Sequence, residues 1–184
     1  MATAEVTQGN LGGRGQLLKF KVQWGSTRRI YMVSFMEPYL FDKPVWGRVD
    51  VFHQDQEFDG YNLKTNGFGL SVGKSYSEYV SASLRYGLDQ SDVYHITRSP
   101  SYTLQKQLDS YGSVIDTRSV TATLTRDSRD FYLDPKTGSK NTVFVQYAGG
   151  PLGGDPNFIK SVADSAWYFP LFWDTVFMSR GRIG

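Results

Sequence analysis

Residues 118–147 read RSVTATLTRDSRDFYLDPKTGSKNTVFVQY, and this stretch decides which kinds of fold the chain can adopt. In its first part, Val120, Ala122 and Leu124 alternate with threonines. A charged turn with one proline and one glycine follows, and residues 142–147 alternate again. Because successive side chains of a strand point to opposite faces, this pattern predicts a hairpin with one apolar and one polar face. The apolar face must contact either a protein core or lipid.

Two other stretches show the same alternation. In residues 66–74 the apolar side chains alternate with glycine and serine, and in residues 80–89 they alternate with serine, arginine, glycine and aspartate. In a soluble protein the polar face of such strands would be solvated, and in a barrel it would line the lumen. The charged residues expected on or near the polar faces are Arg85, Asp89, Arg180 and Arg182.

The composition favours β-structure. The 184 residues include 12 Tyr, 12 Phe, 4 Trp and 19 Gly, and aromatic residues are enriched in strands. The chain has no cysteine, which excludes disulfides and thiolate metal sites. Its formal charge of +2, with basic residues scattered along the chain, argues against nucleic-acid binding. No apolar run approaches the ~18 residues of a transmembrane helix, so the chain could cross a membrane only as part of a β-barrel.

No group of residues has the pattern of an active site. His53 and His95 each stand alone, without a second ligand-type residue at a metal-binding spacing. Asp127 and Asp130 are interleaved with arginines, which is typical of a self-neutralising turn. The glycines of residues 149–154 are not followed by the Lys-Ser/Thr of a phosphate-binding loop. We therefore expect no catalytic, cofactor-binding or metal-binding residues, and we expect that the protein is not an enzyme.

The alternation predicts about ten strands and no helix. Residues 102–111 are the one helical candidate, but this segment is too short and polar to form a helix by itself. Residues 56–66 are expected to begin as a loop. Several strands are ten residues or longer, which is about the length that a tilted strand needs to cross a bilayer. Connections are expected to alternate between short and long, as they do at the two ends of an outer-membrane barrel.

These features predict an all-β fold, an antiparallel up-and-down transmembrane β-barrel segment. The alternative is a soluble β-sandwich binding module, in which the apolar faces would pack against each other. Aromatic residues near the expected strand ends favour the barrel, because they resemble the girdles of membrane barrels at the lipid–water interface. These aromatic residues are Tyr39, Trp46, Tyr86, Tyr147, Trp167, Tyr168, Phe172 and Trp173.

Several motifs are similar, in residue type and in order, to those of the Omp85 superfamily, whose barrel is also called the bacterial surface antigen D15 domain. The resemblance covers essentially the whole chain, and the order of the motifs makes it specific. The motifs are residues 10–15 (NLGGRG), 34–44 (SFMEPYLFDKP), 125–130 (TRDSRD) with Pro135 and Gly138-Ser139, 148–154 (AGGPLGG), 168–171 (YFPL) and 180–182 (RGR).

This resemblance implies a 16-stranded barrel, of which residues 1–184 would hold about ten strands, approximately strands 2 to 11. The preceding periplasmic POTRA domains and the C-terminal part of the barrel would be absent. A structural turn on the periplasmic side is expected to consist of Arg126, Asp127, Arg129, Asp130, Pro135, Gly138 and Ser139. The residues expected to face lipid are Phe68, Leu70, Val72, Val80, Ala82, Leu84, Val120, Ala122 and Leu124.

The resemblance also implies a function. A barrel of this family folds and inserts β-barrel proteins into the bacterial outer membrane of Gram-negative-type cells, without bond chemistry and without a cofactor. Its partners would be the lipid bilayer, client outer-membrane β-barrel proteins and accessory assembly-machine lipoproteins, and not nucleic acid. We expect the isolated segment to be inactive. A polypeptide secretion channel of the same superfamily is the alternative.

Overall fold

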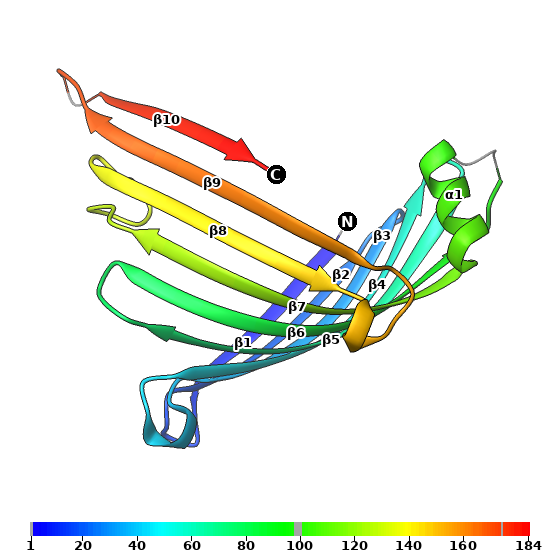
Figure 1. Ribbon diagram of the computed structural model, residues 1–184. Coiled ribbons are helices and arrows are strands. Elements are labelled where there is room, and N and C mark those ends of the chain that lie inside the picture. Colours follow the sequence, from blue (N-terminus) through cyan, green and yellow to red (C-terminus); the bar gives the residue numbers. More distant parts are fainter. Residues whose placement is uncertain (1, 98–100, 174) are drawn as a thin grey trace.

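The computed structural model describes residues 2–97, 101–173 and 175–184, and these form one antiparallel sheet with a single α-helix (Figure 1). The strands are β1 (Ala2–Leu11), β2 (Gln16–Trp24), β3 (Arg28–Glu37), β4 (Trp46–Phe58), β5 (Tyr61–Ser75), β6 (Val80–Tyr94), β7 (Val114–Asp127), β8 (Gly138–Ala148), β9 (Phe158–Pro170) and β10 (Val176–Ile183). The helix is α1 (Tyr102–Tyr111), and two 3₁₀ turns are η1 (Leu40–Asp42) and η2 (Gly150–Leu152).

Each strand pairs with its neighbours in the chain, in the order β1 to β10. The sheet curls without closing, and among the described residues β1 pairs only with β2 and β10 only with β9. The predicted up-and-down antiparallel fold is thus confirmed as an open barrel segment. The alternative of a β-sandwich is wrong, because all ten strands belong to one sheet and no second sheet covers its apolar face.

The strand register divides the sheet into two faces. One row of directly paired residues is Val33, Val51, Phe68, Leu88 and Arg118, and we call the face that carries it the outer face. The opposite face, which carries Asp50, Gly69 and Arg85, is the inner face. Side chains of the inner face are mostly buried or half-buried, whereas apolar side chains of the outer face are exposed or half-buried. This difference follows from the curvature, because side chains on the concave side of a curled sheet converge and cover one another.

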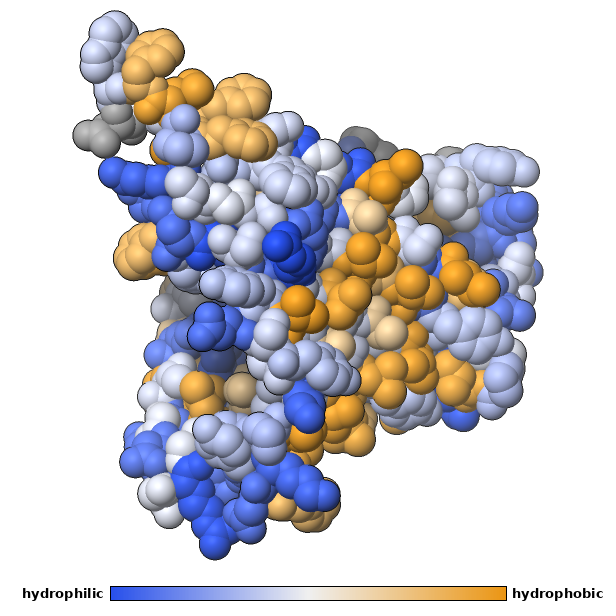
Figure 2. All heavy atoms as spheres, turned by 60° about the vertical axis from the view of Figure 1, so that its left-hand side comes forward, coloured by the Kyte–Doolittle hydropathy of each residue, from blue (hydrophilic) through white to orange (hydrophobic). Residues whose placement is uncertain are grey.

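All apolar residues that the alternation placed on one side do lie on the outer face. Along β5, Phe68, Leu70 and Val72 are exposed while the residues between them are buried. Figure 2 shows the hydrophobic side chains gathered in an oblique band, with hydrophilic residues on both sides of it. An exposed apolar surface of this extent requires an apolar environment, since soluble proteins seldom expose large contiguous apolar patches.

Glycines of β5 let large side chains from neighbouring strands lie flat on the inner face. A β-carbon on Gly67 would lie 2.2 Å from the ring of Phe52, and one on Gly73 would lie 2.3 Å from the ring of Trp46. A β-carbon on Gly69 would lie 2.1 Å from the guanidinium of Arg85. The alternation of glycine with apolar residues in β5 therefore has a steric cause on the inner face.

Arg85 crosses Gly69 to reach a charge network on β4. Its Nη1 donates to Oδ2 of Asp50 at 2.7 Å and lies 3.3 Å from Oγ of Ser71. Nε of Arg48 donates to Oδ1 of the same carboxylate at 2.7 Å. Asp50 is 2% exposed, so its charge depends on these two arginines rather than on water. The network ties β4 to β6 across β5. The prediction that Arg85, Asp89, Arg180 and Arg182 lie on the polar face is confirmed.

The prediction that residues 102–111 are not helical is wrong. Ser101 caps the N-terminus of α1, its Oγ accepting a hydrogen bond from the Leu104 N–H at 3.4 Å. Gly112 ends the helix at a φ of +80°, a conformation that glycine adopts without strain. Local caps thus compensate for the short, polar sequence. None of the helices in the described part of the chain is long and apolar enough to cross a membrane.

Three further expectations are corrected. Residues 56–66 do not begin as a loop, since β4 and β5 continue to a tight turn at Asp59 and Gly60. Short and long connections are not separated between the two ends of the sheet. The long link that holds α1 lies at the same end as the short β4–β5 turn. Trp46 and Tyr168 lie on the inner face and belong to no outer girdle. The polar residues at the end of β4 and the start of β5 pair through the backbone, and the alternation of apolar residues does not reveal such pairing.

Replacing Asp50 by Asn should lower the free energy of unfolding by about 3 kcal/mol, the low end for breaking a buried ion pair, because both arginines are about 40% exposed. Urea titration in phospholipid vesicles, followed by tryptophan fluorescence, measures this change. The matched control is Asp164→Asn, which breaks a more exposed ion pair with Arg180 and should cost less than about 1 kcal/mol. Equal losses in the two variants would show that Asp50 has no special role.

Candidate functional site at the β7–β8 turn

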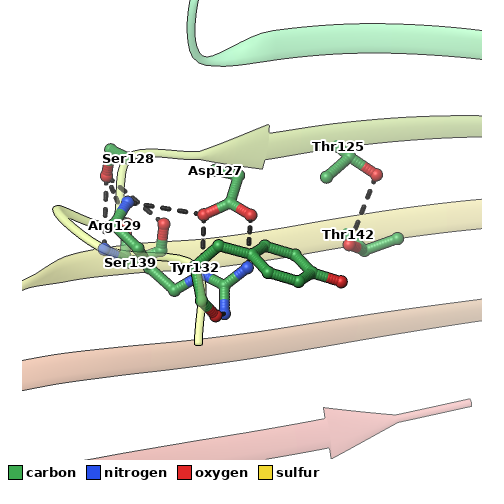
Figure 3. Close-up of polar contacts among 7 residues, drawn as sticks. All are labelled: Thr125, Asp127, Ser128, Arg129, Tyr132, Ser139 and Thr142. Carbon is green, nitrogen blue, oxygen red and sulfur yellow. Dashed lines mark hydrogen bonds and ion pairs between the residues drawn. The ribbon is translucent and has the colours of Figure 1, made fainter. Parts of the chain in front are cut away.

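The turn between β7 and β8 brings together Asp127, Arg129 and Ser139, three of the residues predicted to form a structural turn (Figure 3). β7 ends at Asp127 and β8 begins at Gly138, so the turn itself spans residues 128–137. On the paired strands before it, Thr125 faces Thr142, and their hydroxyl oxygens lie 3.4 Å apart. The register of the two strands thus places the first and last residues of the turn side by side.

Arg129 is held from two sides. Its Nε and Nη2 donate to the two carboxylate oxygens of Asp127 at 2.8 and 2.6 Å, a bidentate pair of high geometric specificity. Its Nη1 donates to the backbone oxygen of Tyr132 at 3.2 Å, and its guanidinium lies 5.1 Å from the centre of the Tyr132 ring. The charges of Asp127 and Arg129 therefore neutralise each other and fix the path of the turn.

Ser128 and Ser139 close the base of the turn. The Ser128 N–H donates to the backbone oxygen of Ser139 at 2.8 Å, and the Ser139 N–H donates to Oγ of Ser128 at 3.2 Å. Ser139 is 1% exposed, so these bonds are shielded from water. Gly138 beside it has a φ of +97°, and a β-carbon there would lie 2.1 Å from the backbone oxygen of Ser128. Only glycine fits this position without a shift of the backbone.

Asp130 orders the outer part of the turn. One of its carboxylate oxygens, Oδ1, accepts hydrogen bonds from the N–H groups of Lys136 at 2.9 Å and Thr137 at 3.1 Å. The backbone N–H of Thr137, with that of Lys136, holds the pKa of the Asp130 carboxyl below its ordinary value, although desolvation acts in the opposite direction. Pro135, just before the two donors, is half-buried.

Arg126 is the one member of the predicted set with a different position. It lies on the outer face with Leu124, and its Nη1 is 3.3 Å from Oγ of Ser139. Sequence reasoning missed Ser128 and Tyr132, which complete the turn. Ser128 lies inside the TRDSRD motif, and its position between two charged pairs could have identified it as a turn residue. Nothing in the sequence pattern identifies Tyr132.

The turn has the properties of a rigid connector rather than of a reactive centre. The carboxylates of Asp127 and Asp130 accept hydrogen bonds from arginine or backbone groups, and among the described residues no hydrogen bond joins a nucleophile of the turn to a general base. In the part of the chain that the structure describes, no cluster of His, Asp and Glu side chains could hold a metal ion. His53 lies far along the chain, and its Nδ1 is 2.6 Å from Oδ1 of Asn66.

Comparison with known proteins assigns these features to a family. Residues 10–184 match the Omp85 superfamily domain. The chain is 26% identical over 180 residues to "Outer membrane protein assembly factor BamA" of Nitratidesulfovibrio vulgaris, covering 97% of this chain and 22% of that protein. It is 23% identical over 168 residues to "Sorting and assembly machinery component 50 homolog A" of Xenopus laevis, covering 91% of this chain and 35% of that protein.

A solved structure has the same fold. The crystal structure of BamA from Haemophilus ducreyi lacking POTRA domains 1–3 matches with a TM-score of 0.84 and 20% sequence identity. The match covers 98% of this chain and 37% of that chain. The sheet described above is therefore the fold of part of a known membrane barrel, and the chain spans well under half the length of each of these proteins.

Replacing Gly138 by Ala should lower the free energy of unfolding by at least about 2 kcal/mol, since both the left-handed backbone and the contact with Ser128 oppose a β-carbon. Urea titration in vesicles measures the loss. Gly13→Ala is the matched control, because Gly13 has a φ of +77° but no atom within 4 Å of the added carbon. If the two substitutions cost the same, the contact with Ser128 contributes nothing.

The Asp130 carboxyl should titrate below the ordinary aspartate value of about 3.9, because its ionised form accepts two backbone hydrogen bonds. A carboxyl with a lowered folded pKa stabilises the turn fully above the ordinary value, and this contribution is lost as the pH falls through the lowered pKa. Nuclear magnetic resonance of the Asp130 side-chain carboxyl carbon gives the midpoint. A midpoint at or above 3.9 would refute the assigned role, and Asp130→Asn is the control that removes the titration.

Proposed function

Because the chain belongs to the Omp85 superfamily, we propose that it forms one wall of an outer-membrane β-barrel that folds and inserts other β-barrel proteins into the membrane. Two of its relatives, an outer membrane protein assembly factor and a sorting and assembly machinery component, support this proposal. The chain spans 22% of the first relative and 35% of the second, and we propose that it takes part in the activity of a whole protein of this kind.

The observation that carries the proposal is the exposed apolar outer face of a single curled sheet. Leu70, Leu84 and Leu124 are 45–54% exposed on strands that pair directly with one another. Lipid would cover these side chains, and the backbone hydrogen bonds of the sheet would satisfy the polar groups that lipid cannot. The proposed lipid-facing residues are Phe68, Leu70, Val72, Val80, Ala82, Leu84, Val120, Ala122 and Leu124.

The two ends of the sheet would then face two compartments. We place the turn at residues 126–139 on the periplasmic side, because its charges are neutralised within a compact connection. The link that holds α1 and the Gly149–Gly154 loop lie at the opposite end (Figure 1). The location proposed is the outer membrane of Gram-negative-type bacteria, and residues 1–184 would correspond to about strands 2 to 11 of a 16-stranded barrel.

An assembly factor of this kind needs no bond chemistry. It would work by presenting strand edges to client β-barrel proteins and by disturbing the bilayer beside them, together with accessory lipoproteins. The part that this chain would supply is the rigid wall. The network at Asp50 and the turn at Asp127 and Arg129 would hold the strands in register while other parts of the barrel move.

A chimaera tests the proposal. The segment of the Nitratidesulfovibrio vulgaris assembly factor that matches this chain is replaced by the corresponding residues of this chain. Because the two are 26% identical over 180 residues, the chimaera should fold as a barrel, shown by heat-dependent mobility in gel electrophoresis. It should also speed the insertion of a client barrel into liposomes over liposomes alone.

Two controls give this experiment its meaning. The same chimaera with Gly138→Ala should insert clients more slowly, because the turn between two wall strands is loosened. An equivalent chimaera built from an Omp85-type secretion channel shows how much activity any barrel wall of the family allows. A folded chimaera that does not accelerate insertion, or does so no better than the secretion-channel chimaera, would contradict an assembly role.

A further inference from the structure

A groove of about 600 Å³ runs across the outer face from β3 to β7. Its two walls are neighbouring rows of outward side chains, and the backbone of the row between them forms its floor. Because adjacent strands lie about 4.8 Å apart, a groove over five strands is about 19 Å long. No residue of the β7–β8 turn lines it.

One wall is polar and is tied together across the strands. The ring of Tyr31 lies 6.0 Å from that of His53, centre to centre, and Nδ1 of His53 is 2.6 Å from Oδ1 of Asn66. Nε2 of Gln90 donates to Oδ1 of Asp116 at 3.0 Å. These contacts join neighbouring strands along the wall, which forms the polar boundary of the groove.

The other wall is apolar until its last member. Val33, Val51, Phe68 and Leu88 are each between 36% and 52% exposed, and the row ends in Arg118 on β7. The groove therefore has an apolar end on β3, between Tyr31 and Val33, and a charged end on β7. Arg118 and Asp116 are the charged groups that line that end.

The tilt of barrel strands explains this change along the groove. Strands of membrane barrels tilt by about 40°, so a row perpendicular to them crosses the bilayer obliquely. The next outward row, which includes Leu70 and Val120, stays uncharged as far as β7. A groove on this line would start at the lipid–water boundary beside Arg118 and descend into the hydrocarbon towards Val33.

We propose that this groove binds one anionic phospholipid, with its phosphate at Arg118 and an acyl chain along Val51 and Val33. An amphiphile matches a site that has Arg118 at one end and an apolar row at the other. The inference rests on the proposed lipid-facing orientation of the outer face. It adds a specific lipid site to a surface otherwise wetted by any lipid.

Trp24 lies beside the β3 end of the groove, next to Tyr31 of the polar wall and paired with Arg29. Its ring centre lies 6.3 Å from that of Tyr31, and its side chain is exposed on the outer face. The substitutions Trp46→Phe, Trp167→Phe and Trp173→Phe leave Trp24 as the one tryptophan of the chain. Bromine atoms on an acyl chain quench nearby tryptophan fluorescence, so quenching measures how often a chain occupies this place.

The experiment uses the full chain in phosphatidylcholine nanodiscs that contain a minor fraction of brominated phosphatidylglycerol. Trp24 should be quenched roughly fivefold more effectively by brominated phosphatidylglycerol than by the same fraction of brominated phosphatidylcholine, as expected for one arginine near an anionic group. All variants carry Arg29→Gln, because the guanidinium of Arg29 lies 5.0 Å from the centre of the Trp24 ring and would itself attract anionic lipid to the reporter. Arg118→Gln should then abolish the preference. Lys64→Gln is the matched control, because Lys64 is another outward cation of the same sheet but does not line the groove, and it should keep the preference.

Two further arms separate the possible failures. Val51→Phe fills the apolar wall at a half-exposed position and should reduce quenching by phosphatidylglycerol without changing the charge. Nanodiscs made wholly of brominated phosphatidylcholine test the orientation itself, and no quenching there would overturn the proposed lipid-facing wall. Quenching in that arm, with no preference for phosphatidylglycerol or with equal losses in Arg118→Gln and Lys64→Gln, would overturn the groove alone.

Discussion

The structure depends on the antiparallel register that ten successive strands share. Side chains alternate between faces with a period of two, so a slip of one residue between any two strands would move their apolar side chains to the polar face. The contacts on the inner face occur only in the observed register, since Arg85 must pass over Gly69 to reach Asp50. The residue types on the inner face therefore fit only the observed strand register.

The β7–β8 turn protects that register at one end of the sheet. Ser128 and Ser139 bond reciprocally across its base, and Asp127 holds Arg129 on the turn side of the strand. A turn with this many internal bonds fixes which residues of β7 and β8 face each other. Asp127, Arg129 and Asp130 each bond to a neighbour in the turn, as their interleaving in the sequence predicts.

The fold could be read from the sequence wherever one face is apolar and the other is not, as in β5 from Phe68 to Val72. It could not be read where both faces are polar, as in the extension of β4 and β5 around Lys64, because only backbone pairing marks a strand there. The turn residues were found because they lie close together in the chain. The ion pair between Arg85 and Asp50 could not be predicted, since 35 residues separate them and only the strand register brings them together.

Pairing only between chain neighbours also has a kinetic consequence. When two successive strands pair, the only loop that must close is the connection between them. The conformational entropy lost on closing that loop is therefore small. The two-residue turn at Asp59 and Gly60 joins the long strands β4 and β5 and closes the shortest of these loops. Such a chain can assemble outward from this hairpin, one strand at a time, and each added strand covers the open edge left by the one before.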